Sequence, residues 1–141
     1  PVVGSTSIIG YHNQYKISGP GIVTGRSGSL GEYQLIWGNF WPHNTSLYVS
    51  DMKGHHVLYL YGMLQTVDFS SLNNGGAIPT LNRNTLSNIA VLEAPKALQQ
   101  EYVHIAEPYY QAMWREQQQI LNLQEARDRL LPKLMSGEVE V

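Results

Sequence analysis

The spacing of apolar and polar residues changes at two points along the 141-residue chain. Before residue 50, short apolar runs, many of them β-branched, alternate with Gly, Pro, Ser and Asn, which is typical of strands joined by tight turns. From His56, apolar residues recur at intervals of three and four, and this period predicts an amphipathic helix of about three turns. The apolar runs predict strands at residues 8–11, 22–24, 33–37, 46–49 and 89–92.

The connections between these elements are predicted from residues that favour turns. Asn82 or Asn84 is a candidate cap for a short helix that would end at Asn88. The residue before Pro79 is pushed out of the helical region, so the chain around it is expected to be extended. Turns are predicted at residues 38–39 and 52–54, a loop at 73–76 and the extended segment at 77–81.

The second change comes at residue 96, where glycine disappears and Gln, Glu, Leu and Arg dominate as far as residue 131. This composition predicts a long helix that Pro108 kinks or splits, that Pro132 ends, and that Gly137 follows as the cap of a last turn. The fold class is therefore α+β. We expect a β-rich domain at residues 1–95 and a helical extension at residues 96–141.

The long helix carries an apolar seam with an imperfect heptad spacing, since Glu116 and Arg127 occupy two of its positions. Residues 109–131 would span about 35 Å, at about 1.5 Å per residue. A helix of this length cannot bury its apolar stripe on a domain of this size alone, so we expect it to pair with a partner helix. The alternative is that it packs on its own domain. The predicted pairing residues are Met113, Ile120, Leu123, Leu130 and Leu134.

Charge argues against a general affinity for nucleic acid. Residues 1–95 hold four basic and four acidic groups, and residues 96–141 hold five and seven, which accounts for the net charge of −2. The strongly basic face of a typical duplex-binding protein is therefore missing, and nonspecific DNA affinity should be low.

The absence of cysteine fits a reducing cytoplasm. Because the chain lacks an initial Met and begins within a strand-like run, we expect a fragment of a longer protein.

Residues 19–31 are rich in glycine and predict a short buried strand that ends in a tight loop. The loop would present Arg26, Ser27 and Ser29, and free backbone N–H groups, hydroxyls and a guanidinium suit a phosphate or the edge of a base. A plain glycine turn between two strands is the alternative. The spacing matches neither of the glycine-rich nucleotide-binding fingerprints, G-x-G-x-x-G and G-x-x-x-x-G-K-[ST].

The sequence offers little for catalysis and more for recognition. No histidine pair has the spacing of a zinc site, so no metal is expected, and the few carboxylates of residues 1–95 are scattered. Asn and Gln can pair with adenine, Arg with guanine, and Ser or Thr with phosphate, although asparagines also serve as caps and turn residues. The candidate DNA-binding residues are Gln14, Arg26, Ser27, Ser29, Asn44, Lys53, Asn82 and Arg83.

Six segments, in this order, resemble the target recognition domains and spacer helices of the specificity subunits of type I restriction-modification systems. They are residues 10–13, 19–23, 25–31, 40–45, 78–83 and 127–138. The resemblance implies a non-catalytic subunit in which each recognition domain reads one half of a split double-stranded DNA site. It also implies that long helices pair antiparallel, set the spacer between the half-sites and dock the methyltransferase subunits.

The resemblance also implies where the chemistry of the complex resides. The methyltransferase subunits bind S-adenosylmethionine and methylate adenine, and a restriction subunit uses ATP and Mg²⁺ to cut unmodified DNA, so no cofactor is expected in this chain. The chain would supply one recognition domain and one spacer helix, as the C-terminal half of a longer subunit or as a half-size subunit that pairs with a second copy. No membrane association is expected.

Two other functions fit the same residues. The glycine-rich loop could hold a small phosphorylated substrate, in which case Arg26 should lie in a deep pocket beside a carboxylate or histidine. The chain could instead be an oligomerisation module whose helix carries the function and whose β-rich head, residues 1–95, is a scaffold.

Overall fold

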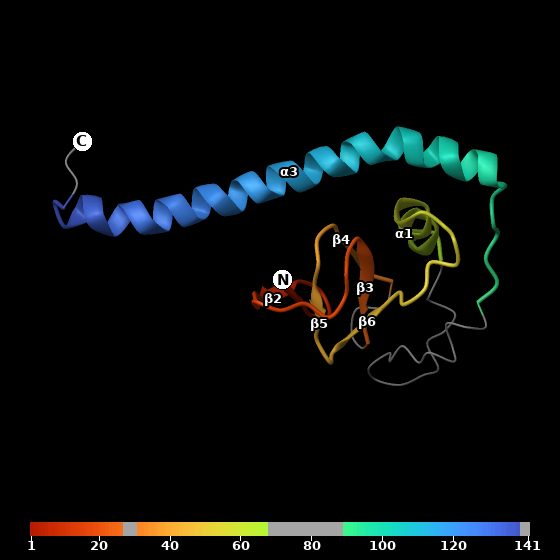
Figure 1. Ribbon diagram of the computed structural model, residues 1–141, viewed down its shortest axis with the longest axis horizontal. Coiled ribbons are helices and arrows are strands. Elements are labelled where there is room, and N and C mark those ends of the chain that lie inside the picture. Colours follow the sequence, from red (N-terminus) through yellow and green to blue (C-terminus); the bar gives the residue numbers. More distant parts are fainter. Residues whose placement is uncertain (27–30, 68–88, 139–141) are drawn as a thin grey trace. The chain divides into compact units, whose positions relative to one another are not determined.

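The computed structural model describes residues 1–26, 31–67 and 89–138 (Figure 1). The chain divides into two compact units, Pro1–Val103 and His104–Val141, so the first unit includes the start of the long helix. The predicted α+β class is confirmed: six short strands form two sheets, and a short and a long helix follow within the described residues. The predicted domain boundary between residues 95 and 96 stays a prediction.

The larger sheet is built around β3 (Gly21–Gly25), all five residues of which are buried. This strand pairs antiparallel with β4 (Tyr33–Ile36) on one side and with β6 (Ser46–Tyr48) on the other. Gly21 at the start of β3 permits close packing, because a Cβ there would lie 2.6 Å from the Phe40 ring. The apolar run between them fills the interior of the head.

The smaller sheet has the order β2–β1–β5, in which β1 (Val2–Val3) pairs antiparallel with β2 (Ile8–Gly10) and parallel with β5 (Trp41–Pro42). The core of the head draws on both sheets and on the residue before β5. Its buried members are Val3, Val23, Ile36 and Phe40, with Ile17 packed against them.

Four predicted strands are confirmed, at residues 8–11, 22–24, 33–37 and 46–49, each within two residues of its observed bounds. The strand predicted at residues 89–92 is wrong, because that backbone is neither strand nor helix and the side chains of Val91 and Leu92 are 45% and 95% exposed. A short apolar run becomes a strand only where a sheet offers it hydrogen bonds and cover. The loop, extended segment and short helix predicted at residues 73–88 lie outside the described residues.

The helix predicted from His56 is confirmed as α1 (Val57–Gln65), and His56 caps it by accepting a hydrogen bond from the Leu58 amide. The turn predicted before it is also confirmed, since Lys53 and Gly54 both have positive φ, at 51° and 75°.

The predicted long helix is confirmed as α3 (Lys96–Met135), forty residues without a break. Pro108 therefore does not split it. The prediction that Pro132 ends it is wrong, because the helix continues to Met135. Proline removes only one backbone donor, and the next turn is still closed by the Ser136 amide bonding to the Pro132 carbonyl at 3.0 Å. Gly137, at φ 73°, follows the helix and caps its last turn, as predicted.

Candidate nucleic-acid interface

The structure brings together two predicted DNA-binding residues that are 18 positions apart, Arg26 and Asn44. Arg26 follows the last residue of β3, and its backbone amide donates to the Thr45 carbonyl at 3.0 Å. Its Nη1 donates to the Asn44 carbonyl at 3.3 Å. The pairing of Gly25 with Ser46 in the sheet determines this meeting, because it aligns the end of β3 with the turn that precedes β6.

That turn, residues 43–46, is bound to both sheets. The Ser46 amide donates to the His43 carbonyl at 3.0 Å, and the His43 amide donates to the Val3 carbonyl at 2.9 Å. Ser46 is 8% exposed, and its hydroxyl lies within hydrogen-bonding distance of the same two carbonyls. The Ser5 hydroxyl donates to the Thr45 carbonyl at 2.9 Å. The backbone that supports the Arg26 guanidinium is thus held from several directions.

The side chains at this turn remain available to a ligand. Arg26 and Asn44 are both exposed, and Arg26 forms no ion pair with the carboxylates of the described residues. A guanidinium has five N–H donors, and the bond to the Asn44 carbonyl uses one of them. The others can bind guanine O6 and N7 or a phosphate in a bidentate manner, and the Asn44 carboxamide beside it can pair with adenine.

Two other candidates are exposed and are not hydrogen-bonded to this turn. The backbone amide of Gln14 donates to His12 Nδ1 at 3.0 Å, and the His12 ring centroid lies 5.3 Å from that of Trp41. Lys53 Nζ lies 2.8 Å from Asp51 Oδ2. The hydrogen bond from Lys53 lowers the pKa of Asp51, and Asp51 raises the pKa of Lys53, so a carboxylate already accompanies this cation.

Four candidates, Ser27, Ser29, Asn82 and Arg83, lie outside the described residues. The sequence did not predict the roles of Ser5 and Ser46, because a single serine in a β-rich segment does not show which backbone carbonyl it will bond to.

The five predicted helix-pairing residues all lie on α3 and are all exposed.

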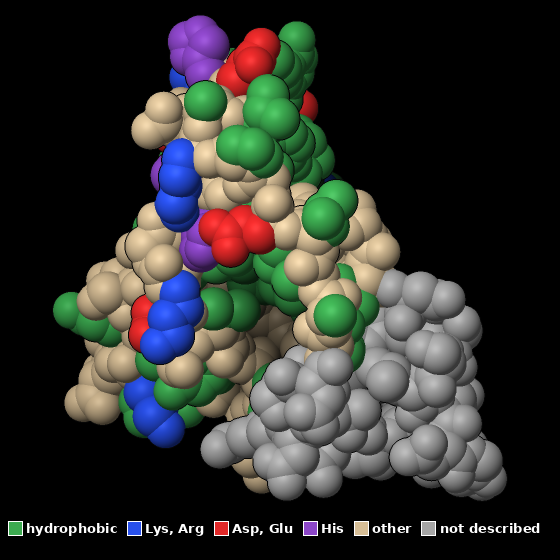
Figure 2. Space-filling view, turned by 90° about the vertical axis from the view of Figure 1, so that its right-hand side faces the viewer, with side chains coloured by type: hydrophobic (Ala, Val, Ile, Leu, Met, Phe, Trp, Pro, Cys, Tyr) green, Lys and Arg blue, Asp and Glu red, His purple; other side chains and the backbone are tan. Residues whose placement is uncertain are grey.

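The charge distribution of the head agrees with its near-neutral composition. Figure 2 shows one face of the molecule, on which a few Lys and Arg side chains lie in separate places, some of them beside acidic or histidine side chains. Within the described ranges, no group of three or more His, Asp or Glu side chains could hold a metal ion. In the same ranges no helix has the length and apolar character that crossing a membrane requires.

The described residues thus comprise a β-rich head, with an exposed guanidinium and carboxamide at one turn, and a long helix. The chain belongs to the family of type I restriction modification DNA specificity domains, whose model matches residues 2–125. The predicted family is thereby confirmed. Members of this family are the non-catalytic component of type I restriction-modification systems and serve in DNA sequence recognition.

A curated relative supports the same family. The chain is 29% identical over 89 residues to the type I restriction enzyme MjaIX specificity subunit of Methanocaldococcus jannaschii. The match covers 62% of this chain and 20% of that protein. The aligned part therefore spans about a fifth of the length of the subunit that it resembles.

Proposed function

We propose that this chain reads one half of a bipartite double-stranded DNA site, with Arg26 and Asn44 at the reading point. The observation that carries the proposal is the turn at residues 43–46, which fixes the backbone beside an exposed guanidinium and an exposed carboxamide. These are the side chains that distinguish guanine and adenine in the major groove. An exposed Arg26 suits this role better than it suits a deep pocket for a small phosphorylated substrate.

The rest of the complex supplies what this chain lacks. Methyltransferase subunits, docked on the helical extension, would provide S-adenosylmethionine and much of the contact with phosphates, so a nearly neutral head suffices. A restriction subunit would bind ATP and Mg²⁺. The second half-site would be read by another recognition domain, in the same full-length chain or in a second copy, and the complex would act in the cytoplasm.

The test is methylation-site mapping in cells that carry the complete complex, with Arg26→Ala compared with the native chain. A bidentate contact to guanine contributes about 1–3 kcal/mol of discrimination, so methylation of the native motif should fall roughly 5- to 150-fold and one motif position should become degenerate. Lys16→Ala removes an exposed cation elsewhere on the head and should leave the motif unchanged.

The outcomes separate base reading from phosphate binding. If Arg26 binds phosphate, Arg26→Ala will weaken methylation of all sequences equally and lower the salt dependence of DNA binding by about one charge. An unchanged motif and rate would remove Arg26 from the interface.

A further inference from the structure

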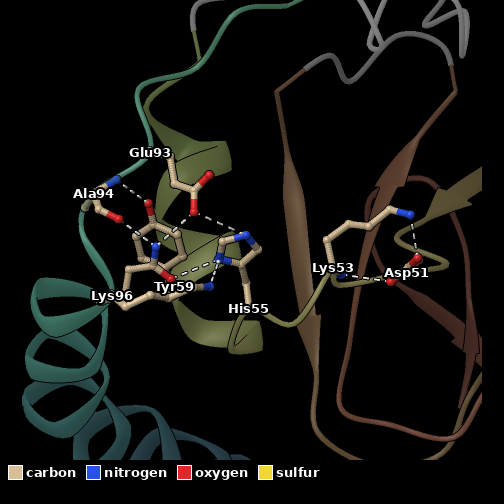
Figure 3. Close-up of polar contacts among 8 residues, drawn as sticks. Asp51, Lys53, His55, Tyr59, Glu93, Ala94 and Lys96 are labelled. Atoms are coloured by element: carbon tan, nitrogen blue, oxygen red, sulfur yellow. Dashed lines mark hydrogen bonds and ion pairs between the residues drawn. The ribbon is translucent and has the colours of Figure 1, made fainter.

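The polar side chain of Gln99 is buried at the start of α3, where the helix meets its own head. Gln99 is 5% exposed and is the sole buried residue of this helix. A buried carboxamide is costly unless its donors and acceptor are paired. We call the set of contacts around it the Gln99 network (Figure 3); its members are His55, Tyr59, Glu93, Ala94, Lys96 and Gln99.

The network fixes the orientation of the Gln99 amide. Nε2 donates to the Ala94 carbonyl at 2.7 Å and approaches Glu93 Oε1 at 3.4 Å. Because a carbonyl can only accept, the amide nitrogen must face Ala94, and Oε1 must face His55 Nδ1, 2.9 Å away. This places a proton on Nδ1 of His55, so the Lys96 ammonium, 3.2 Å from the same nitrogen, is a neighbouring charge and not a hydrogen-bond donor to it.

The network joins three segments of the first compact unit. The Ala94 amide, just before α3, donates to the Tyr59 hydroxyl on α1 at 3.0 Å. The Tyr59 ring stacks on the His55 ring, with centroids 5.7 Å apart. Both backbone groups of Ala94 are therefore paired with side chains, and α1 is connected to the first turn of α3.

A second contact lies one turn further along the same helix. A Cβ on Gly62 of α1 would be 2.6 Å from the Tyr102 hydroxyl, so the Tyr102 side chain lies directly against the backbone of α1. Residues 99 and 102 lie on one face of α3, because side chains three residues apart are neighbours on a helix. Two contacts on one face fix the rotation of the first turns as well as their position.

We propose that the Gln99 network is a positioning device for spacing: it sets the rotation at which α3 leaves the head, and through it the distance between half-sites that the complex accepts. The inference rests on the proposed function, since spacing has meaning only for a bipartite reader. It assigns His55 and Gln99 a role in specificity without contact with DNA. The network holds the first turn of α3, and that helix runs without a break from Lys96 to Met135.

The experiment measures methyl transfer by the complete complex to duplex oligonucleotides. Both half-sites are held constant, and the spacer is the mapped length or one base pair shorter or longer. Gln99→Ala and His55→Ala should lower the preference for the mapped spacer by about tenfold, the effect of losing one buried hydrogen bond. A second set of duplexes carries single base changes in the half-site at the mapped spacer, and the preference of the variants for half-site bases on this set should not change.

Two variants act as matched controls. Gln100→Ala removes an exposed glutamine from the next position of the same helix and should keep the native spacer preference. His55→Asn keeps an N–H donor near the place of Nδ1, so it should restore most of the preference that His55→Ala loses.

The results distinguish this inference from the proposed function. If the native complex methylates duplexes equally well whichever base in the half-site is changed, the proposed function fails. If the native complex reads the half-site but Gln99→Ala and His55→Ala keep its spacer preference, the inference is overturned. Equal loss of methylation on all three spacers in both variants would also overturn it, because that result indicates a role in stability alone.

Discussion

Single residues in this head are placed by hydrogen bonds that a sequence pattern does not reveal. The alternation at residues 46–49 predicts a half-buried strand, and β6 lies there, yet the buried residue is Ser46. Its hydroxyl can be buried because two backbone carbonyls lie within reach, those of Val3 and His43. Arg26 and Asn44 could each be proposed from residue type. Their proximity depends on strand register and was not predictable.

Tyr33 provides a prediction at this scale. Burial raises the pKa of the Tyr33 phenol from about 10 to about 12. Between these values an unfolded chain releases the proton and the folded chain keeps it, so the free energy of unfolding should fall as the pH rises from about 10 to about 12. Urea denaturation across this pH range should show that the free energy of unfolding falls less steeply in Tyr33→Phe than in the native chain.

Tyr15→Phe is the control for this titration, because Tyr15 is 56% exposed. It should retain the native pH dependence. Identical curves for the native chain and Tyr33→Phe would contradict the prediction.

Among the elements, length decides what the sequence can predict. Strands of three or more residues, and the helices α1 and α3, follow from the spacing of apolar residues. β1 and β5 have two residues each, too few to show alternation. The run at 89–92 has the composition of a strand, but the Ala94 backbone beyond it bonds to the Tyr59 and Gln99 side chains instead of to a neighbouring strand.

A pair of glycines tests the packing at the start of β3. A Cβ on Gly19 would overlap the backbone carbonyl of Gly38, whereas a Cβ on Gly38 would meet nothing within 4 Å. Gly19→Ala should therefore lower the free energy of unfolding by about 1–3 kcal/mol, the usual cost of overpacking. Gly38→Ala should change it little or raise it by up to about 1 kcal/mol. Urea denaturation of the full chain measures both, and equal effects would contradict the close approach.

At the scale of the whole molecule, α3 exposes many large apolar side chains along its length. Met113, Ile120 and Leu123 are 62%, 54% and 70% exposed. Surfaces of this kind usually mark an interface. The apolar seam was predictable from heptad spacing, but the partner was not, because one chain carries no record of what covers it.

Leu123→Asp tests the predicted pairing of α3 with a partner helix. Burying a leucine contributes about 1.5–3 kcal/mol, so a charge at this position should weaken self-association of the chain at least about tenfold in analytical ultracentrifugation. Gln124→Asp introduces the same charge at the adjacent exposed position and should have a smaller effect.

Leu123→Asp also distinguishes the proposed function from the alternative that the chain is an oligomerisation module. A chain that only assembles would lose its function with Leu123→Asp and keep it with Arg26→Ala. A chain that reads DNA should be impaired by both. Unaltered association in Leu123→Asp would remove that residue from the pairing surface.

The hydrogen bonds to the Thr45 carbonyl affect the free energy of DNA recognition. It accepts one hydrogen bond from the Arg26 amide and another from the Ser5 hydroxyl, so both of its lone pairs are occupied before any ligand arrives. The main chain at this point is preorganised, so the conformational entropy lost on association comes mainly from the exposed Arg26 and Asn44 side chains. We therefore expect this contact to discriminate strictly between ligands of different geometry, because the conformational entropy lost in forming it is small.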